Sequence, residues 1–170
     1  YAFNFNPAGY LHPSRRNDFY SGKISYEIWT KPRVYPYLSD AILEKLSLKN
    51  KIFLQFPHEK LSLALLSLPR MARLATHIGA VALGSKVRGS IGREQVVAWK
   101  EKLGGDAYQF VVNSGKLLPS FPRIAEDKLS ANVQTIGYSL IARSLTEAPE
   151  PMSARALLKL PANLPELLDG

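Results

Sequence analysis

Apolar residues recur at helical spacing over most of the chain after residue 38, which predicts a succession of helices. The predicted helices span 40–48, 57–83, 93–103, 107–118, 124–146 and 153–160. Apolar residues occupy nearly every side of the 57–83 segment, so we expect it to be the central and most buried helix. Pro69 lies inside that segment and must kink the helix or divide it in two.

Polar and glycine residues at the edges of these segments predict where the helices begin and end. Ser39 and Asp106 can cap the helices that follow them, and Ser153 can begin the last one. The Gly104-Gly105 pair is expected to stop the 93–103 helix. The glycines between positions 84 and 92 predict a short basic connector made of tight turns.

The first 37 residues differ from the rest, because they are aromatic, contain several prolines and show no helical period. We therefore predict an all-α protein with a single domain over residues 1–170. It comprises an irregular N-terminal strap (1–37), a helical core (38–160) and a proline-broken tail (161–170). The residues predicted to share one core are Leu65, Leu68, Ile78, Val81, Phe110, Val111, Val133, Ile136 and Leu140.

Length and composition agree with a folded domain that needs no covalent or metal staple. A chain of 170 residues with 46% hydrophobic content can bury roughly 70% of its unfolded surface. It has no cysteine, which excludes a disulfide scaffold, a cysteine-type zinc site and a thiol nucleophile. No apolar run reaches the roughly 20 residues that a membrane span requires, so we expect no membrane insertion.

Positive charge is concentrated in the first part of the chain. Residues 1–104 contain 16 Lys and Arg against 7 Asp and Glu, whereas residues 105–170 contain 6 against 7, for a net charge of +8. The candidate partner-binding residues are Arg70, Arg73, Lys86, Arg88 and Arg93. Such a basic side fits a nucleic acid, an acidic protein or simply a solvated face.

The sequence contains no strong match to a metal-binding, nucleotide-binding, DNA-binding or catalytic motif. His12, His58 and His77 form no short metal-ligand pattern. We expect His77 to be a satisfied core or interface histidine and His58 to lie in the first turn of a helix. The segment 84–92 lacks the GxxxxGK[ST] pattern of a phosphate-binding loop, and 93–118 makes a poor helix-turn-helix because its second helix offers few basic contacts. We therefore expect no catalytic residue, no metal and no cofactor, and a role in binding.

The segment Pro7-Ala-Gly-Tyr-Leu-His12 resembles the N-terminal Pro-Ala-x-Tyr-Leu-His signature of the SctK (YscK/PscK-like) proteins of type III secretion systems. Leu63-Ala-Leu-Leu-Ser-Leu-Pro-Arg is similar to the leucine-rich central helix of that family. Gln134-Thr-Ile-Gly-Tyr-Ser-Leu-Ile-Ala-Arg and Ala148-Pro-Glu-Pro resemble its C-terminal part. The resemblance touches most of the chain in the same order, although 15–36 departs from it.

The resemblance implies a non-enzymatic adaptor of the cytosolic sorting platform, at the cytosolic face of the bacterial inner membrane. SctK-like proteins join the cytoplasmic domain of the ring protein SctD to the SctQ pods and, through SctL, to the ATPase SctN. A small basic nucleic-acid-binding regulator is the alternative hypothesis.

The family motif itself has two interpretations. Pro7, Tyr10, Leu11 and His12 either strap the N-terminal segment onto the helices or contact a partner directly. We expect the structural role, because burying large apolar side chains contributes several kcal/mol.

Overall fold

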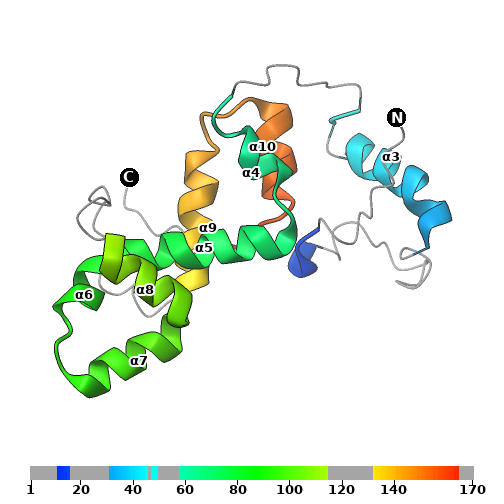
Figure 1. The fold of residues 1–170 in the computed structure, drawn as a ribbon. Helices are drawn as coiled ribbons and strands as arrows, with labels where there is room; N and C mark the ends of the chain where they lie inside the picture. Colours follow the sequence, from blue (N-terminus) through cyan, green and yellow to red (C-terminus); the bar gives the residue numbers. More distant parts are fainter. Residues whose placement is uncertain (1–10, 16–30, 46, 50–57, 115–131, 165–170) are drawn as a thin grey trace. The chain divides into compact units, whose positions relative to one another are not determined.

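The computed structural model describes residues 11–15, 31–45, 47–49, 58–114 and 132–164, and their regular structure is entirely helical (Figure 1). The predicted all-α class is therefore confirmed. The 3₁₀ segments are η2 (Pro13–Arg15) and η3 (Pro32–Val34). The α-helices are α3 (Tyr35–Lys45), α4 (Leu61–Leu65), α5 (Leu68–Ala82), α6 (Gly84–Gly89), α7 (Arg93–Leu103), α8 (Gly105–Ser114), α9 (Val133–Ser144) and α10 (Glu150–Leu157).

The described residues fall into two compact units. The first contains the residues up to Met71 together with Leu145–Ala162, and the second contains Ala72–Ser144 with residues 163 and 164. The boundary lies within α5, between its fourth and fifth residues. The single domain predicted over residues 1–170 stays a prediction.

In the first unit, α10 packs against α4 and places a lysine in the interior. Lys159 follows α10 and is only 2% exposed. Its ammonium donates a hydrogen bond to the carbonyl of Ala64, in the last turn of α4. A cation at this position satisfies a carbonyl that the helix leaves without an intrahelical partner. Burial nevertheless lowers the pKa of Lys159 from 10.5 to about 8.

The same unit binds residues 11–15 of the N-terminal strap. Leu11 is buried, and the backbone N–H of His12 donates to the Leu158 carbonyl at 2.9 Å. Arg15 donates from Nε to the Leu160 carbonyl at 2.7 Å and from Nη2 to the Pro161 carbonyl at 3.1 Å. The chain after α10 is thus held by residues almost 150 positions earlier. Pro7 and Tyr10 lie outside the described residues.

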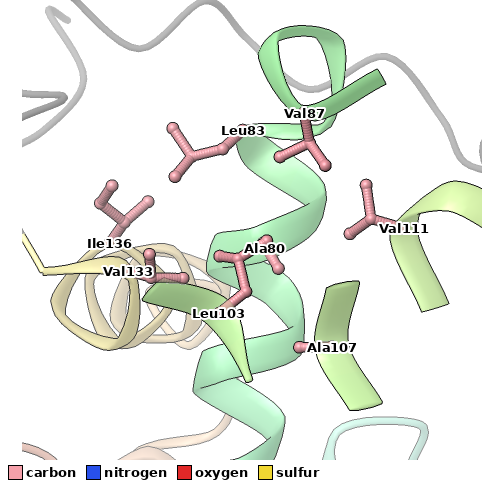
Figure 2. Close-up of a cluster of buried hydrophobic side chains, with 8 residues drawn as sticks. All are labelled: Ala80, Leu83, Val87, Leu103, Ala107, Val111, Val133 and Ile136. Atoms are coloured by element: carbon pink, nitrogen blue, oxygen red, sulfur yellow. The ribbon is translucent and has the colours of Figure 1, made fainter. Parts of the chain in front are cut away.

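The second unit is built around a cluster of apolar side chains from the five helices α5 to α9 and from the residue that follows α5. Figure 2 shows this cluster. Its members are Ala80, Leu83, Val87, Leu103, Ala107, Val111, Val133 and Ile136. All eight are aliphatic and less than 5% exposed, so their burial is the main source of this unit's stability.

Two glycines let α5 and α9 approach until their backbones touch. A Cβ atom added at Gly137 would overlap the carbonyl of Ala75, and one at Gly79 would overlap the carbonyl of Val133. Across the same contact, the Gln134 side-chain amide donates to the Ala72 carbonyl at 3.3 Å. Both helices therefore need a residue without a side chain at the crossing.

Prolines explain two helix starts that differ from the predicted ones. The helix predicted over 40–48 runs from Tyr35 to Lys45, so Ser39 lies inside it and is no cap. Pro36 is its second residue, where a missing N–H costs nothing. The last helix likewise begins at Glu150, with Pro151 in its first turn, and not at Ser153.

Pro69 divides the predicted central helix, which was one of the two expected outcomes. It occupies the second position of α5, while Leu66 before it is extended, with φ −60° and ψ 142°. Asp106 is also no cap, because α8 begins at Gly105 and Asp106 lies in its first turn. The predicted stop of α7 is confirmed: Gly104 adopts φ +79° and its N–H donates to the Lys100 carbonyl.

The predicted core is partly confirmed. Val111, Val133 and Ile136 are buried, and Leu68, Ile78, Val81 and Leu140 are half-buried. Leu65 and Phe110 are wrong predictions, at 70% and 40% exposed. Leu65 ends the short α4, whose other side packs against α10. Phe110 lies beside the α8 face that buries Ala107 and Val111.

Candidate protein-binding surface

Among the described residues, the corner between α6 and α7, in the second unit, combines exposed positive charge with an exposed apolar side chain. The sequence predicts turns here, but residues Gly84–Gly89 form the helix α6, which packs against α8. Its Val87 is 1% exposed and anchors the helix in the core. After α6 the chain is extended at Ser90 and Gly92, and α7 begins at Arg93. We call residues 89–93 the α6–α7 corner.

Hydrogen bonds fix the shape of the α6–α7 corner. The Ser90 hydroxyl donates to the Lys86 carbonyl at 2.9 Å, which ties the corner to the last turn of α6. The Trp99 indole N–H donates to the Ser90 Oγ at 3.0 Å, which ties it to α7. Lys102 places its ammonium 5.4 Å from the centroid of the Trp99 ring. One serine thus joins the two helices that flank the corner.

Three of the predicted partner-binding residues surround this corner. Lys86 and Arg88 lie on α6, Arg93 begins α7, and all three are exposed. Within the described residues no ion pair involves any of them. The sequence holds no carboxylate between Glu59 and Glu94, and Glu94 follows Arg93 directly in the first turn of α7. The three cations outnumber this one carboxylate, so the corner presents a net positive charge.

The other two predicted residues have different surroundings. Arg73 on α5 donates from Nη2 to Asp106 on α8 at 2.5 Å, so its charge is compensated within the second unit. Arg70 is exposed in the first turn of α5 and belongs to the first unit. The structure therefore groups Lys86, Arg88 and Arg93 around one corner. Arg73 is paired elsewhere in the second unit, and Arg70 belongs to the first unit.

The remaining titratable groups show no arrangement that holds a metal ion, because the described part of the chain has no cluster of three or more His, Asp or Glu residues. His77 is satisfied, as predicted: its Nδ1 lies 2.8 Å from the Arg73 carbonyl and its ring meets Phe110 edge-on. Its Nε2 lies 3.5 Å from Asp106. His58 lies three positions before the first residue of α4, so its predicted place in the first helical turn is wrong.

Sequence reasoning missed the apolar member of the corner. Ile91 is 92% exposed, more than any other large apolar residue that the structure describes. The signal that could have revealed it is its isolation: it is the one large side chain between Gly89 and Gly92. An isoleucine in such a sequence has no helical neighbour to pack against.

No helix within the described ranges is long and apolar enough to cross a membrane. Among known proteins, a family model described as YOP proteins translocation protein K (YscK) matches residues 1–168. No curated protein and no solved structure matches the chain. Since the family model spans nearly the whole chain, this protein belongs to the YscK family of type III secretion components, which are not known as enzymes.

Proposed function

We propose that this protein is a non-enzymatic adaptor of the sorting platform beneath the injectisome. In this role it joins the cytoplasmic domain of the ring protein SctD to the SctQ pods, and through SctL to the ATPase SctN. The observation that carries the proposal is the match to the YscK family over residues 1–168. The proposed location is the cytosolic face of the bacterial inner membrane.

The surface chemistry supports a binding role. Adaptors that exchange partners during assembly favour interfaces with charge at the rim, because charged rims accelerate encounter without permanent attachment. Lys86, Arg88 and Arg93 supply such charges, and we assign them to an acidic surface on SctD or SctQ. Arg70, in the first unit, is proposed separately as a contact to an acidic surface, whereas Arg73 is already paired with Asp106.

The direct test is reconstitution with the SctQ protein and the SctD cytoplasmic domain of the same secretion system. We expect the purified chain to form a complex with each and to bridge the two in size-exclusion chromatography. Failure to bind either protein at low salt would refute the adaptor role. Retention of a random-sequence DNA duplex at physiological salt, in a mobility-shift assay, would favour the alternative of a nucleic-acid-binding regulator.

The contribution of the basic group is tested by reversing three charges together. In the variant Lys86→Glu, Arg88→Glu, Arg93→Glu we expect an intact fold, slower association and failed platform assembly. A control with the same charge change reverses Lys31, Arg33 and Lys49, which are exposed in the first unit; of these Lys49 forms an exposed ion pair with Glu44 at 4.0 Å. Because both variants change the net charge equally, only a local contact distinguishes them. If the first variant bound with wild-type affinity at low salt, Lys86, Arg88 and Arg93 would not contact a partner and would only form a solvated face.

A further inference from the structure

Ile91 at the α6–α7 corner is an apolar side chain that the fold does not use. It is 92% exposed, so it contributes almost no burial to the second unit. A single exposed aliphatic residue is common on protein surfaces and needs no explanation by itself. Three further properties of this corner give it meaning.

The first property is the absence of bulk on either side of Ile91. Neither neighbouring glycine is required by the backbone, because neither Gly89 nor Gly92 has a positive φ. A Cβ at Gly89 would meet nothing within 4 Å, and one at Gly92 would meet only the Gln95 side chain at 3.7 Å or more. The fold would accept side chains at both positions, and their absence leaves room for a partner to approach Ile91.

The second property is that the corner is already fixed. The hydrogen bonds from Trp99 to Ser90 and from Ser90 to Lys86 hold the backbone on both sides of the tip. A preorganised side chain loses less conformational entropy when it binds than one on a mobile loop. Ile91 is therefore placed to act without rearrangement.

The third property is the charge around it. Lys86, Arg88 and Arg93 flank the tip and have no ion-pair partner among the described residues. An apolar centre with a charged rim is the usual arrangement of a protein-binding hot spot. A nucleic acid would match the positive rim but offers no apolar socket for an aliphatic side chain along its phosphate backbone.

We propose that Ile91 is the apolar anchor of this interface and enters an apolar socket bordered by aspartate or glutamate side chains on a partner protein. This inference rests on the proposed adaptor function and deepens it. The three cations set the rate and salt dependence of association, while Ile91 supplies the part of the affinity that salt does not screen.

The test compares Ile91→Ser with Leu65→Ser, a matched loss of an exposed aliphatic residue in the first unit. Both variants should unfold at the wild-type urea midpoint, because neither side chain is buried. Affinity for the SctQ protein and the SctD cytoplasmic domain is measured by titration calorimetry at low and physiological salt. We expect Ile91→Ser to weaken binding to one of them by about 10- to 100-fold at both salt concentrations. Leu65→Ser should bind as the wild type does.

The salt dependence separates the two contributions. In Ile91→Ser the dependence of log Kd on salt should equal that of the wild type, whereas the triple charge reversal should flatten it. Equal affinity of Ile91→Ser and the wild type for both proteins would overturn the anchor while leaving the adaptor role intact. If the wild-type chain bound neither protein, both proposals would fall. Loss of affinity in Leu65→Ser as large as in Ile91→Ser would also overturn the anchor, since the effect would not be specific to the corner.

Discussion

The buried Lys159 predicts an unusual dependence of stability on pH. Its ammonium lies in the first unit, 2% exposed, and burial lowers its pKa in the folded protein to about 8. In the unfolded chain the amine titrates near its ordinary value of 10.5. Below pH 8 both states hold the proton, and the folded state bears the full cost of a buried charge.

The sign of the effect follows from the number of bound protons. Between pH 8 and 10.5 the unfolded chain holds more protons at Lys159 than the folded protein, so the free energy of unfolding rises with pH in this window. A depression from 10.5 to about 8 corresponds to about 3 kcal/mol in total. About 1.4 kcal/mol of this is regained by pH 9 and about 2.5 kcal/mol by pH 10.

The measurement compares the wild type with Lys159→Met, which keeps a long apolar side chain but cannot titrate. Urea unfolding followed by far-ultraviolet circular dichroism gives the free energy of unfolding of each protein from neutral pH to about pH 10. The difference between the two isolates Lys159. The contributions of other titratable groups cancel in this difference. One of them is Tyr138, whose pKa is raised by burial, so its contribution to the free energy of unfolding falls as the pH rises above 10.

The neutral amine still donates to the Ala64 carbonyl, but more weakly than the ammonium does, so loss of the proton removes part of this hydrogen bond's contribution and opposes the gain. We expect the free energy of unfolding of the wild type to rise steadily from pH 8 upwards relative to that of Lys159→Met. A difference that stayed constant up to pH 10 would show that water reaches the ammonium, and the burial argument would then be wrong.

Three further substitutions test individual contacts. Gly137→Ala should destabilise the second unit by about 1 to 3 kcal/mol because its methyl group would overlap the Ala75 carbonyl, whereas Gly89→Ala, in open space, should not destabilise it. Equal urea midpoints for the two variants would contradict the close helix crossing. Asp106→Asn should cost at most about 1 kcal/mol of stability, because the ion pair between Asp106 and Arg73 is exposed. A larger loss of stability in thermal unfolding would show that this ion pair is stronger than its exposure suggests. Leu11→Ala should cost about 2 to 4 kcal/mol, and an unchanged midpoint would mean that the strap does not stabilise the first unit.

The amino-acid sequence by itself determined the class of the protein and several of its local features. Helical periodicity and the lack of cysteine predicted an all-α chain without a disulfide, and the end of α7 followed from Gly104, whose positive φ most other residues avoid. Val111, Val133 and Ile136 were predicted to be buried because apolar side chains at helical spacing mark a helix's inner side.

Helix boundaries near prolines depended on context that the periodic pattern does not contain. Pro36 falls in the segment predicted to be irregular and Pro151 precedes the predicted helix start at Ser153, yet each lies in the first turn of a helix. A proline is compatible with a loop. It is equally compatible with the first turn of a helix, because the N–H groups of that turn have no intrahelical partner.

Only the tertiary structure decided which apolar residues lack a neighbour and which polar residue is enclosed. Periodicity identifies the apolar side of a helix but not the element that covers it, so Leu65 and Phe110 were predicted inside and lie exposed. Ile91 stands free and Lys159 is buried for the same reason: the exposure of a side chain is set by segments distant in sequence that pack against it. The candidate surface therefore combines cations nominated from the sequence with an isoleucine whose exposure the tertiary structure established.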